Sequence, residues 1–235
     1  GPDRCANPRP ARLATAARAL DATPAVYTEL QQRLTHREAL VTLHTQVRNQ
    51  LHALLHQPVV VASVRAQLEA LSQHLTAQIA EIERELAVTL AQDAVWAAAA
   101  ARLQTITGIG TLTAITILTT TLNFTQCRTA EAATAYAGLA PNPYQSGSSV
   151  RGRSRIGHTG NRQLRRVLYL ASLSAARYNP VIKPFYERLR AAGKPPKVAR
   201  CAAARKLLHL AWAVVTKECD FDPGYAQRLR ATAIG

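Results

Sequence analysis

The sequence has little cysteine and no long apolar run. Its four cysteines form no CxxC pair and have no histidine at zinc-ligand spacing, so we expect reduced, packed thiols, as in a cytosolic protein. No apolar stretch approaches the length of a membrane-spanning helix, and the first residues lack the pattern of a secretory signal peptide. These features argue against a disulfide-stapled protein and against a membrane protein. The cysteines are Cys5, Cys127, Cys201 and Cys219.

Acidic residues are almost missing from one long segment of the chain. Between Cys127 and Lys217 there are 17 Lys and Arg residues and only two acids, Glu131 and Glu187. The whole chain has 29 Lys and Arg residues against 14 Asp and Glu residues, so the part outside this segment is neutral. Positive charge confined to one segment predicts a polyanionic partner for that segment. A membrane surface is disfavoured, because the segment lacks the aromatic-rich amphipathic face that such binding uses.

Alternation of apolar and polar residues with a period of two is also missing, so we expect an all-α fold. Residues 1–22 are rich in Pro, Arg and Ala, and we expect partial order there. Residues 23–102 are predicted to form a coiled-coil linker or arm, with one helix at about 25–57 and a second from Ser63 to about Arg102. Both helices carry an apolar stripe with steps of three and four. The stripes are Leu40, Leu43, Val47, Leu51 and Leu54 in the first helix, and Val64, Leu68, Leu71, Leu75, Ile79, Ile82, Leu86 and Leu90 in the second.

These two helices can pair with each other as an antiparallel hairpin, or each can pair with a second copy of the chain. Long coiled hairpins serve as spacers or dimerisation arms more often than as reaction sites. We therefore expect a structural arm that mediates homo-oligomer formation.

Residues 103–235 are predicted to form a compact helical domain. Helices are expected at 130–137, at 161–178, at about 181–192 and near 197–217, each ended by Gly, Pro or Asn or by a loss of the apolar pattern. Residues 103–118 fit a helix-hairpin-helix motif with Gly108, Ile109 and Gly110 at its turn. Such glycines leave free amides at the N-terminus of the second helix, where a DNA phosphate can dock without base readout. The alternative is an ordinary packing turn that uses the same glycines.

The stretch from Tyr144 to Leu168 contains no acid and gathers hydroxyls, glycines and arginines. Gly- and Ser-rich backbone can approach a phosphate closely, arginines supply bidentate donors, and a following helix N-terminus adds amide donors. We predict a phosphate or nucleic-acid site here, against the alternative of a solvated basic loop. Its candidate residues are Ser146, Ser148, Ser149, Arg151, Arg153, Arg155, His158, Asn161, Arg162, Arg165 and Arg166.

Three blocks in the second half of the chain resemble the C-terminal transposase domain of the insertion-sequence one-ten family, with its one-sixteen and nine-oh-two relatives. They read TITGIGTLTA, AYAGLAPNPYQSGSSVRGRSRIGHTGNRQLRRVLY and NPVIKPFYERLRAAGKPPKVARCAAARKLLHLAW. The run HREALVTLHTQVRNQLHALL resembles the coiled-coil linker of the same family. The resemblance implies a prokaryotic, nucleoid-associated DNA transposase or recombinase that uses a structured guide RNA to choose its DNA.

The same resemblance implies a nucleophilic serine in this domain and metal-binding acids in an N-terminal RuvC-like domain. The family's serine falls on Ser146, with Ser148 and Ser149 as local rivals. Arg151, Arg153 and Arg155 are candidates to stabilise the charge on the attacked phosphate. Mg²⁺ is expected in the RuvC-like domain and no cofactor in this chain.

This sequence departs from the family pattern in two places. Thr121–Phe124 stands where relatives often have a glycine followed by an acid. Only Asp3 and Asp21 precede the linker, so we expect the RuvC-like domain to be missing here and the chain to be unreactive without it. Gly1-Pro2 resembles the remnant of a cleaved tag. The alternative functions are a non-catalytic nucleic-acid-binding module and an oligomerisation scaffold.

Overall fold

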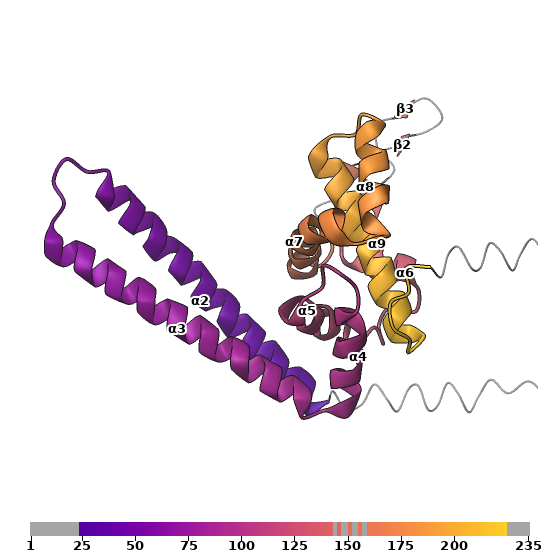
Figure 1. The fold of residues 1–235 in the computed structure, drawn as a ribbon, viewed down its shortest axis with the longest axis horizontal. Helices are drawn as coiled ribbons and strands as arrows, with labels where there is room; N and C mark the ends of the chain where they lie inside the picture. Colours follow the sequence, from indigo (N-terminus) through magenta and orange to yellow (C-terminus); the bar gives the residue numbers. More distant parts are fainter. Residues whose placement is uncertain (1–23, 143–144, 147–149, 152–154, 157–158, 225–235) are drawn as a thin grey trace, which may run out of the picture.

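The computed structural model describes residues 24–142, 145–146, 150–151, 155–156 and 159–224, and its fold is all-α, as predicted. Two long helices form an arm that extends away from a compact helical body (Figure 1). The arm consists of α2 (Ala25–Leu55) and α3 (Ala62–Ala91). The body contains α4 (Ala94–Gln104), α5 (Thr111–Thr121), α6 (Ala130–Tyr136), α7 (Arg162–Tyr178), α8 (Ile182–Ala191) and α9 (Pro196–Thr216).

The arm is an antiparallel hairpin formed within one chain. Arg33 Nε lies 3.3 Å from the Glu85 carboxylate, and Arg37 pairs with Glu83 at 2.6 Å, so advancing along α2 means retreating along α3. A small apolar core of Leu40, Val47, Leu75 and Ile82 lies between the two helices, and Leu68 and Ile79 pack against it. Of the two pairings that the stripes allowed, the structure therefore shows the hairpin.

The predicted seam is buried along only part of its length. Leu86 and Leu90 join the core of the body, whereas Val64 and Leu71 are exposed, as is Leu43 on the opposite helix. Leu30 of α2 also lies in the core of the body. The arm and the body thus share one core at this end, and the domain limits predicted at residues 22–23 and 102–103 stay predictions.

One prediction for the arm was wrong. The second helix does not continue from Ser63 to Arg102 but ends at Ala91, and α4 begins at Ala94. Asp93 causes the break: its backbone is extended, and its carboxylate accepts hydrogen bonds from the amides of Val95 and Trp96 at 2.9 and 3.1 Å. An aspartate in this position satisfies the free amides of a new helix and so starts it.

Helix α9 is the centre of the body. It contacts α4, α6, α7 and α8, and Ala203, Leu207, Leu208 and Ala211 on it are completely buried. Trp212 is half-buried and donates its indole N–H to the Cys127 carbonyl at 2.9 Å. The helix bounds agree with the sequence prediction within two residues for α6 to α9.

The serine-rich stretch enters the fold as a short hairpin. Segment β1 (Pro141–Asn142) pairs with β4 (Arg155–Ile156), and β2 (Gln145–Ser146) pairs with β3 (Val150–Arg151), both antiparallel. We call residues 141–156 the basic hairpin. Its β2–β3 end lies at the edge of the body in Figure 1.

Candidate nucleic-acid interface

The basic hairpin carries the predicted nucleophile. Its register sets Ser146 opposite Val150 and Gln145 opposite Arg151, while Asn142 lies opposite Arg155. Ser146 is therefore the neighbour, along the strand, of Gln145, which pairs with Arg151. Four other predicted site residues, Ser148, Ser149, Arg153 and His158, lie outside the described residues.

The chain segments on either side of the basic hairpin lie in close backbone contact between α6 and α7, in a contact that we call the clamp. Gly138 and Gly160 both have positive φ, at 68° and 95°. A Cβ on Gly138 would lie 2.2 Å from the Thr159 carbonyl oxygen, and a Cβ on Gly160 would lie 2.5 Å from the Gly138 nitrogen. Only glycines allow the two backbones to approach this closely. Gly138 also follows the end of α6, and the sequence pattern gives no sign of its second role in this contact.

Two of the predicted site residues hold this clamp together. The Asn161 side chain caps α7 by accepting from the Leu164 amide at 2.9 Å, and its Nδ2 donates to the Tyr136 hydroxyl at 3.3 Å. Arg165 Nη1 donates to the Thr159 carbonyl at 2.9 Å and reaches the Gly138 carbonyl at 3.5 Å. Both side chains therefore position the base of the hairpin.

The other two arginines of α7 differ in what they offer a ligand. Arg166 Nη1 lies 2.6 Å from the Glu38 carboxylate of α2, which joins the body to the arm. Arg162, in the first turn of α7, is exposed and has no described hydrogen-bond or ion-pair partner. Arg162 is thus the more available of the two for a phosphate.

The predicted helix-hairpin-helix turn joins α4 to α5, and its glycines occupy different environments. Gly108 has φ of +108°, and a Cβ there would lie 2.8 Å from the Cβ of Ala175 on α7. Ile109 is buried, and its amide donates to the Ile106 carbonyl. Gly110 is exposed, and an added Cβ would meet no atom within 4 Å. The face of the turn at Gly108 packs on α7, so the face open to a ligand is at Gly110, where α5 begins without a side-chain cap. DNA binding by this turn stays a prediction.

Asn179 fixes the turn to the corner between α7 and α8. It is completely buried, its Nδ2 donates to the Thr107 carbonyl at 2.9 Å, and its Oδ1 accepts from the amides of Val181 and Ile182. Sequence reasoning used Asn179-Pro180 only as a helix stop. Its partner is 72 residues away, and no local signal marks such a contact.

The described cysteines differ in their burial, and the described residues contain no metal site. Burial raises the pKa of the Cys127 and Cys201 thiols, as expected for packed cysteines. Cys219 is exposed, so the prediction of a packed thiol was wrong there. Within the described ranges, no group of three or more His, Cys, Asp and Glu side chains could hold a metal ion. The Mg²⁺ that the resemblance implies therefore has no ligand set among these residues. Across the same ranges, every helix is too short or too polar to cross a membrane.

Comparison with known proteins matches the second half of the chain to transposases. Residues 100–187 match the model of the family described as "Transposase IS116/IS110/IS902 family". The pilin gene-inverting protein of Moraxella lacunata is 36% identical over 125 residues, which cover 52% of this chain and 38% of that protein. The transposase for insertion sequence element IS1328 of Yersinia enterocolitica is 32% identical over 219 residues, 79% of this chain and 62% of that protein.

A third relative is an uncharacterized protein of insertion element IS110 from Streptomyces coelicolor. It is 34% identical over 113 residues, which cover 48% of this chain and 28% of that protein. The chain thus spans less than two thirds of each of these relatives. The matched region contains α5, α6, α7, the basic hairpin and the turn before α5. The match of residues 100–187 to the IS116/IS110/IS902 transposase family agrees with the resemblance that the sequence motifs indicated.

Proposed function

We propose that this chain contributes the DNA-binding and nucleophile-bearing part of a DNA transposase or recombinase. The observation that carries the proposal is the basic hairpin, in which antiparallel pairing keeps the backbones of Ser146 and Arg151 within one register position. Arg155, which pairs with Asn142, and Arg162, at the start of α7, add positive charge at the base of this hairpin. Attack of a hydroxyl on a phosphodiester needs positive charge to stabilise the phosphate oxygens, and the hairpin and the helix that follows it contain arginines that can supply this charge.

The relatives' names support the same reaction class. One is called a pilin gene-inverting protein and another a transposase for an insertion sequence element. Both names describe rearrangement of DNA. The family match at residues 100–187 includes the basic hairpin and α7. We carry this activity over to the present chain as a proposal.

The proposed step is an exchange of one phosphodiester for another. Ser146 Oγ attacks a DNA phosphorus atom and loses its proton, a P–O bond to serine forms, and the P–O bond to one strand end breaks. The leaving oxygen takes up a proton and becomes a strand hydroxyl. Attack of a hydroxyl from a second strand on the phosphoserine then reverses these events and joins new ends. Arginine guanidinium groups stabilise the extra negative charge on the phosphate oxygens during both attacks.

Two further parts of the proposal rest on the resemblance. A structured guide RNA selects the DNA, and copies of the chain associate through the arm. The exposed Leu43, Val64 and Leu71 near the far end of the arm support self-association, because apolar residues at coiled-coil positions are normally covered. Replacing Leu43 and Leu71 with Gln should lower the oligomeric mass measured by light scattering; an unchanged mass would show that these residues mediate no association.

The decisive experiment compares Ser146→Ala, Ser148→Ala and Ser149→Ala with the wild type. Each protein is incubated with nicked duplex DNA and a RuvC-like metal-binding domain supplied in cis or in trans, and covalent protein–DNA adducts are separated on denaturing gels. DNA binding is measured in parallel by fluorescence anisotropy. We expect Ser146→Ala to bind normally and form no adduct, and the other two variants to keep most of their activity.

The other outcomes assign the chain to a different role. An adduct in Ser146→Ala and none in a neighbour would move the nucleophile to that neighbour. Loss of binding in Ser146→Ala would make Ser146 a phosphate ligand. Steeply salt-dependent binding without any adduct would indicate a non-catalytic nucleic-acid-binding module. Weak binding that hardly responds to salt would indicate a scaffold, because phosphate contacts make binding depend strongly on salt.

A further inference from the structure

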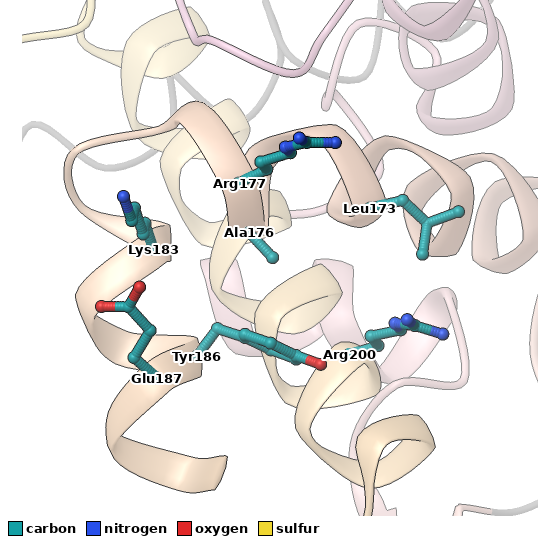
Figure 2. A pocket seen from close by; sticks show the side chains of 7 residues that line it. All are labelled: Leu173, Ala176, Arg177, Lys183, Tyr186, Glu187 and Arg200. Carbon is teal, nitrogen blue, oxygen red and sulfur yellow. The ribbon is translucent and has the colours of Figure 1, made fainter. Parts of the chain in front are cut away.

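A pocket of about 310 Å³ lies between α7, α8 and α9, and none of the predicted site residues lines it. Its polar lining comes from all three helices: Arg177 from α7, Lys183, Tyr186 and Glu187 from α8, and Arg200 from α9. Figure 2 shows these side chains around one space, with the Tyr186 hydroxyl pointing toward Arg200. Three cations, one hydroxyl and one acid therefore meet in a pocket that sequence reasoning did not find.

No carboxylate of the described residues neutralises the three cations. Among the described residues, Arg177, Lys183 and Arg200 have no carboxylate within 4.0 Å, and even Glu187, one turn after Lys183, is farther away than that. The Arg177 guanidinium stands over the Tyr178 ring, 5.4 Å from its centroid, which restrains it. Arg200 is charged at neutral pH, as every arginine is, and a hydrogen bond with the Tyr169 hydroxyl raises its pKa further. Like charges held together without a counter-ion favour an anionic ligand.

The surroundings favour a polymer over a small anion. From Arg162 to Lys217 the chain has thirteen Lys and Arg residues and a single acid, Glu187. Several of these cations continue from the pocket along the exposed surface of α8 and the start of α9: Arg188, Arg190, Lys194 and Lys197. A small anion would use the pocket alone, whereas a polyanion uses the pocket and the charged surface beside it.

We propose that this pocket binds the phosphodiester backbone of a nucleic acid, as a contact separate from the basic hairpin. Arg177 and Arg200 offer paired N–H donors to phosphate oxygens, and Lys183 adds a point charge. The Tyr186 hydroxyl donates a further hydrogen bond. The inference rests on the proposed nucleic-acid-binding function and extends the interface to α8 and α9, where no site residue was predicted. DNA and RNA present the same phosphate chemistry, and the test separates them.

The test measures how binding depends on salt. The pocket variant combines Arg177→Gln, Lys183→Gln and Arg200→Gln in the 235-residue chain. A matched control variant removes three positive charges from the exposed surface of the arm, as Arg48→Gln, Arg65→Gln and Arg84→Gln. Dissociation constants are measured by anisotropy between 50 and 300 mM salt, with duplex DNA, single-stranded DNA and an RNA hairpin as the probes. Circular dichroism verifies that both variants keep the helical content of the wild type.

We expect the slope of log K against log salt to become shallower by about two to three in the pocket variant, since each lost phosphate contact contributes about 0.7 to 0.9. The control variant should keep the wild-type slope to within about one contact. A change with DNA only, or with RNA only, identifies the polymer that occupies the pocket, and equal changes identify a contact to phosphate alone. A pocket variant that binds all three probes like the control overturns the inference. A wild-type chain that binds none of the probes overturns the proposed function as well.

Glu187→Gln tests the same pocket in the opposite direction. It removes the single acid of the pocket and keeps the size of the side chain, so affinity should rise severalfold. Glu69→Gln, on the arm, is the matched control and should leave affinity unchanged. Unchanged or weaker binding by Glu187→Gln would contradict the inference even if the triple variant failed to fold.

Discussion

Gly108→Ala is the change that most directly tests how the turn before α5 is built. The new Cβ would lie 2.8 Å from the Ala175 Cβ and 3.0 Å from its Cα and backbone nitrogen. Side-chain crowding of this kind costs about 1–3 kcal/mol. A φ of +108° adds strain of about 1–2 kcal/mol for any residue with a Cβ. We therefore expect the free energy of unfolding to fall by about 2–5 kcal/mol.

Gly110→Ala is the control within the same turn. Gly110 has φ of −92°, and an added Cβ meets nothing within 4 Å, so the free energy of unfolding should change by less than about 1 kcal/mol. Both variants can be unfolded in urea and followed by circular dichroism. A second measurement, binding to duplex DNA, separates fold from contact: the larger Gly110→Val should stay folded and bind every duplex more weakly, because the predicted contact is to phosphate.

Ala175→Gly in the Gly108→Ala background tests the cause of the instability. It removes the 2.8 Å contact but leaves the two backbone contacts at 3.0 Å and the positive φ, so it should recover only part of the loss. If Gly108→Ala were as stable as the wild type, the turn would not pack on α7 as described. If Gly110→Val bound DNA as tightly as the wild type, the turn would be a packing element and nothing more.

Two further predictions concern buried polar groups. Asn123→Gly should raise the free energy of unfolding by about 1 kcal/mol in urea titrations. Asn123 has φ of 53°, and its buried Oδ1 accepts no hydrogen bond from the described residues; a loss of stability would contradict this reasoning. His209→Gln should reduce the loss of stability between pH 7 and pH 5. Burial lowers the pKa of His209, with Glu131 opposing and Arg205 adding to the shift, so the unfolded chain takes up this proton first as the pH falls through about 6.5. Equal losses in the variant and the wild type would refute that assignment.

The helix bounds could be predicted because local residues fix them. Asn161 caps α7 with its own side chain, Asn179-Pro180 ends it, and Gly193 follows α8, so each signal lies within a few residues of its effect. The break between α3 and α4 also has a local signal in Asp93. It was missed because the apolar steps to Leu90 and the alanines from residue 97 to 101 predict helix on both sides of it.

The candidate site was predictable in its charge but not in its geometry. The density of arginines between 151 and 166 indicated a phosphate site, yet the pattern assigned the same role to each of them. In the structure Arg165 donates to backbone carbonyls and Arg166 pairs with Glu38, so only Arg162 of these three is exposed without a partner among the described residues. Which cation remains available depends on what lies across from it, and that contact is tertiary.

Helix α7 connects the basic hairpin to the pocket on α7, α8 and α9. The distance between these two contacts therefore sets the shortest nucleic acid that can bind both. Arg162 begins α7 and Arg177 lies 15 residues later, about 22 Å along the helix axis at 1.5 Å per residue. A helix rotates by about 100° per residue, so 15 residues bring Arg177 to within about 60° of the direction of Arg162. Adjacent base pairs are spaced by about 3.4 Å along a duplex, so a duplex lying along α7 would span the two contacts with about six or seven base pairs. An oligonucleotide much shorter than this can occupy one contact but not both. The salt slope should therefore become steeper once the probe exceeds that length, and a slope independent of probe length would show that the two contacts do not bind one duplex.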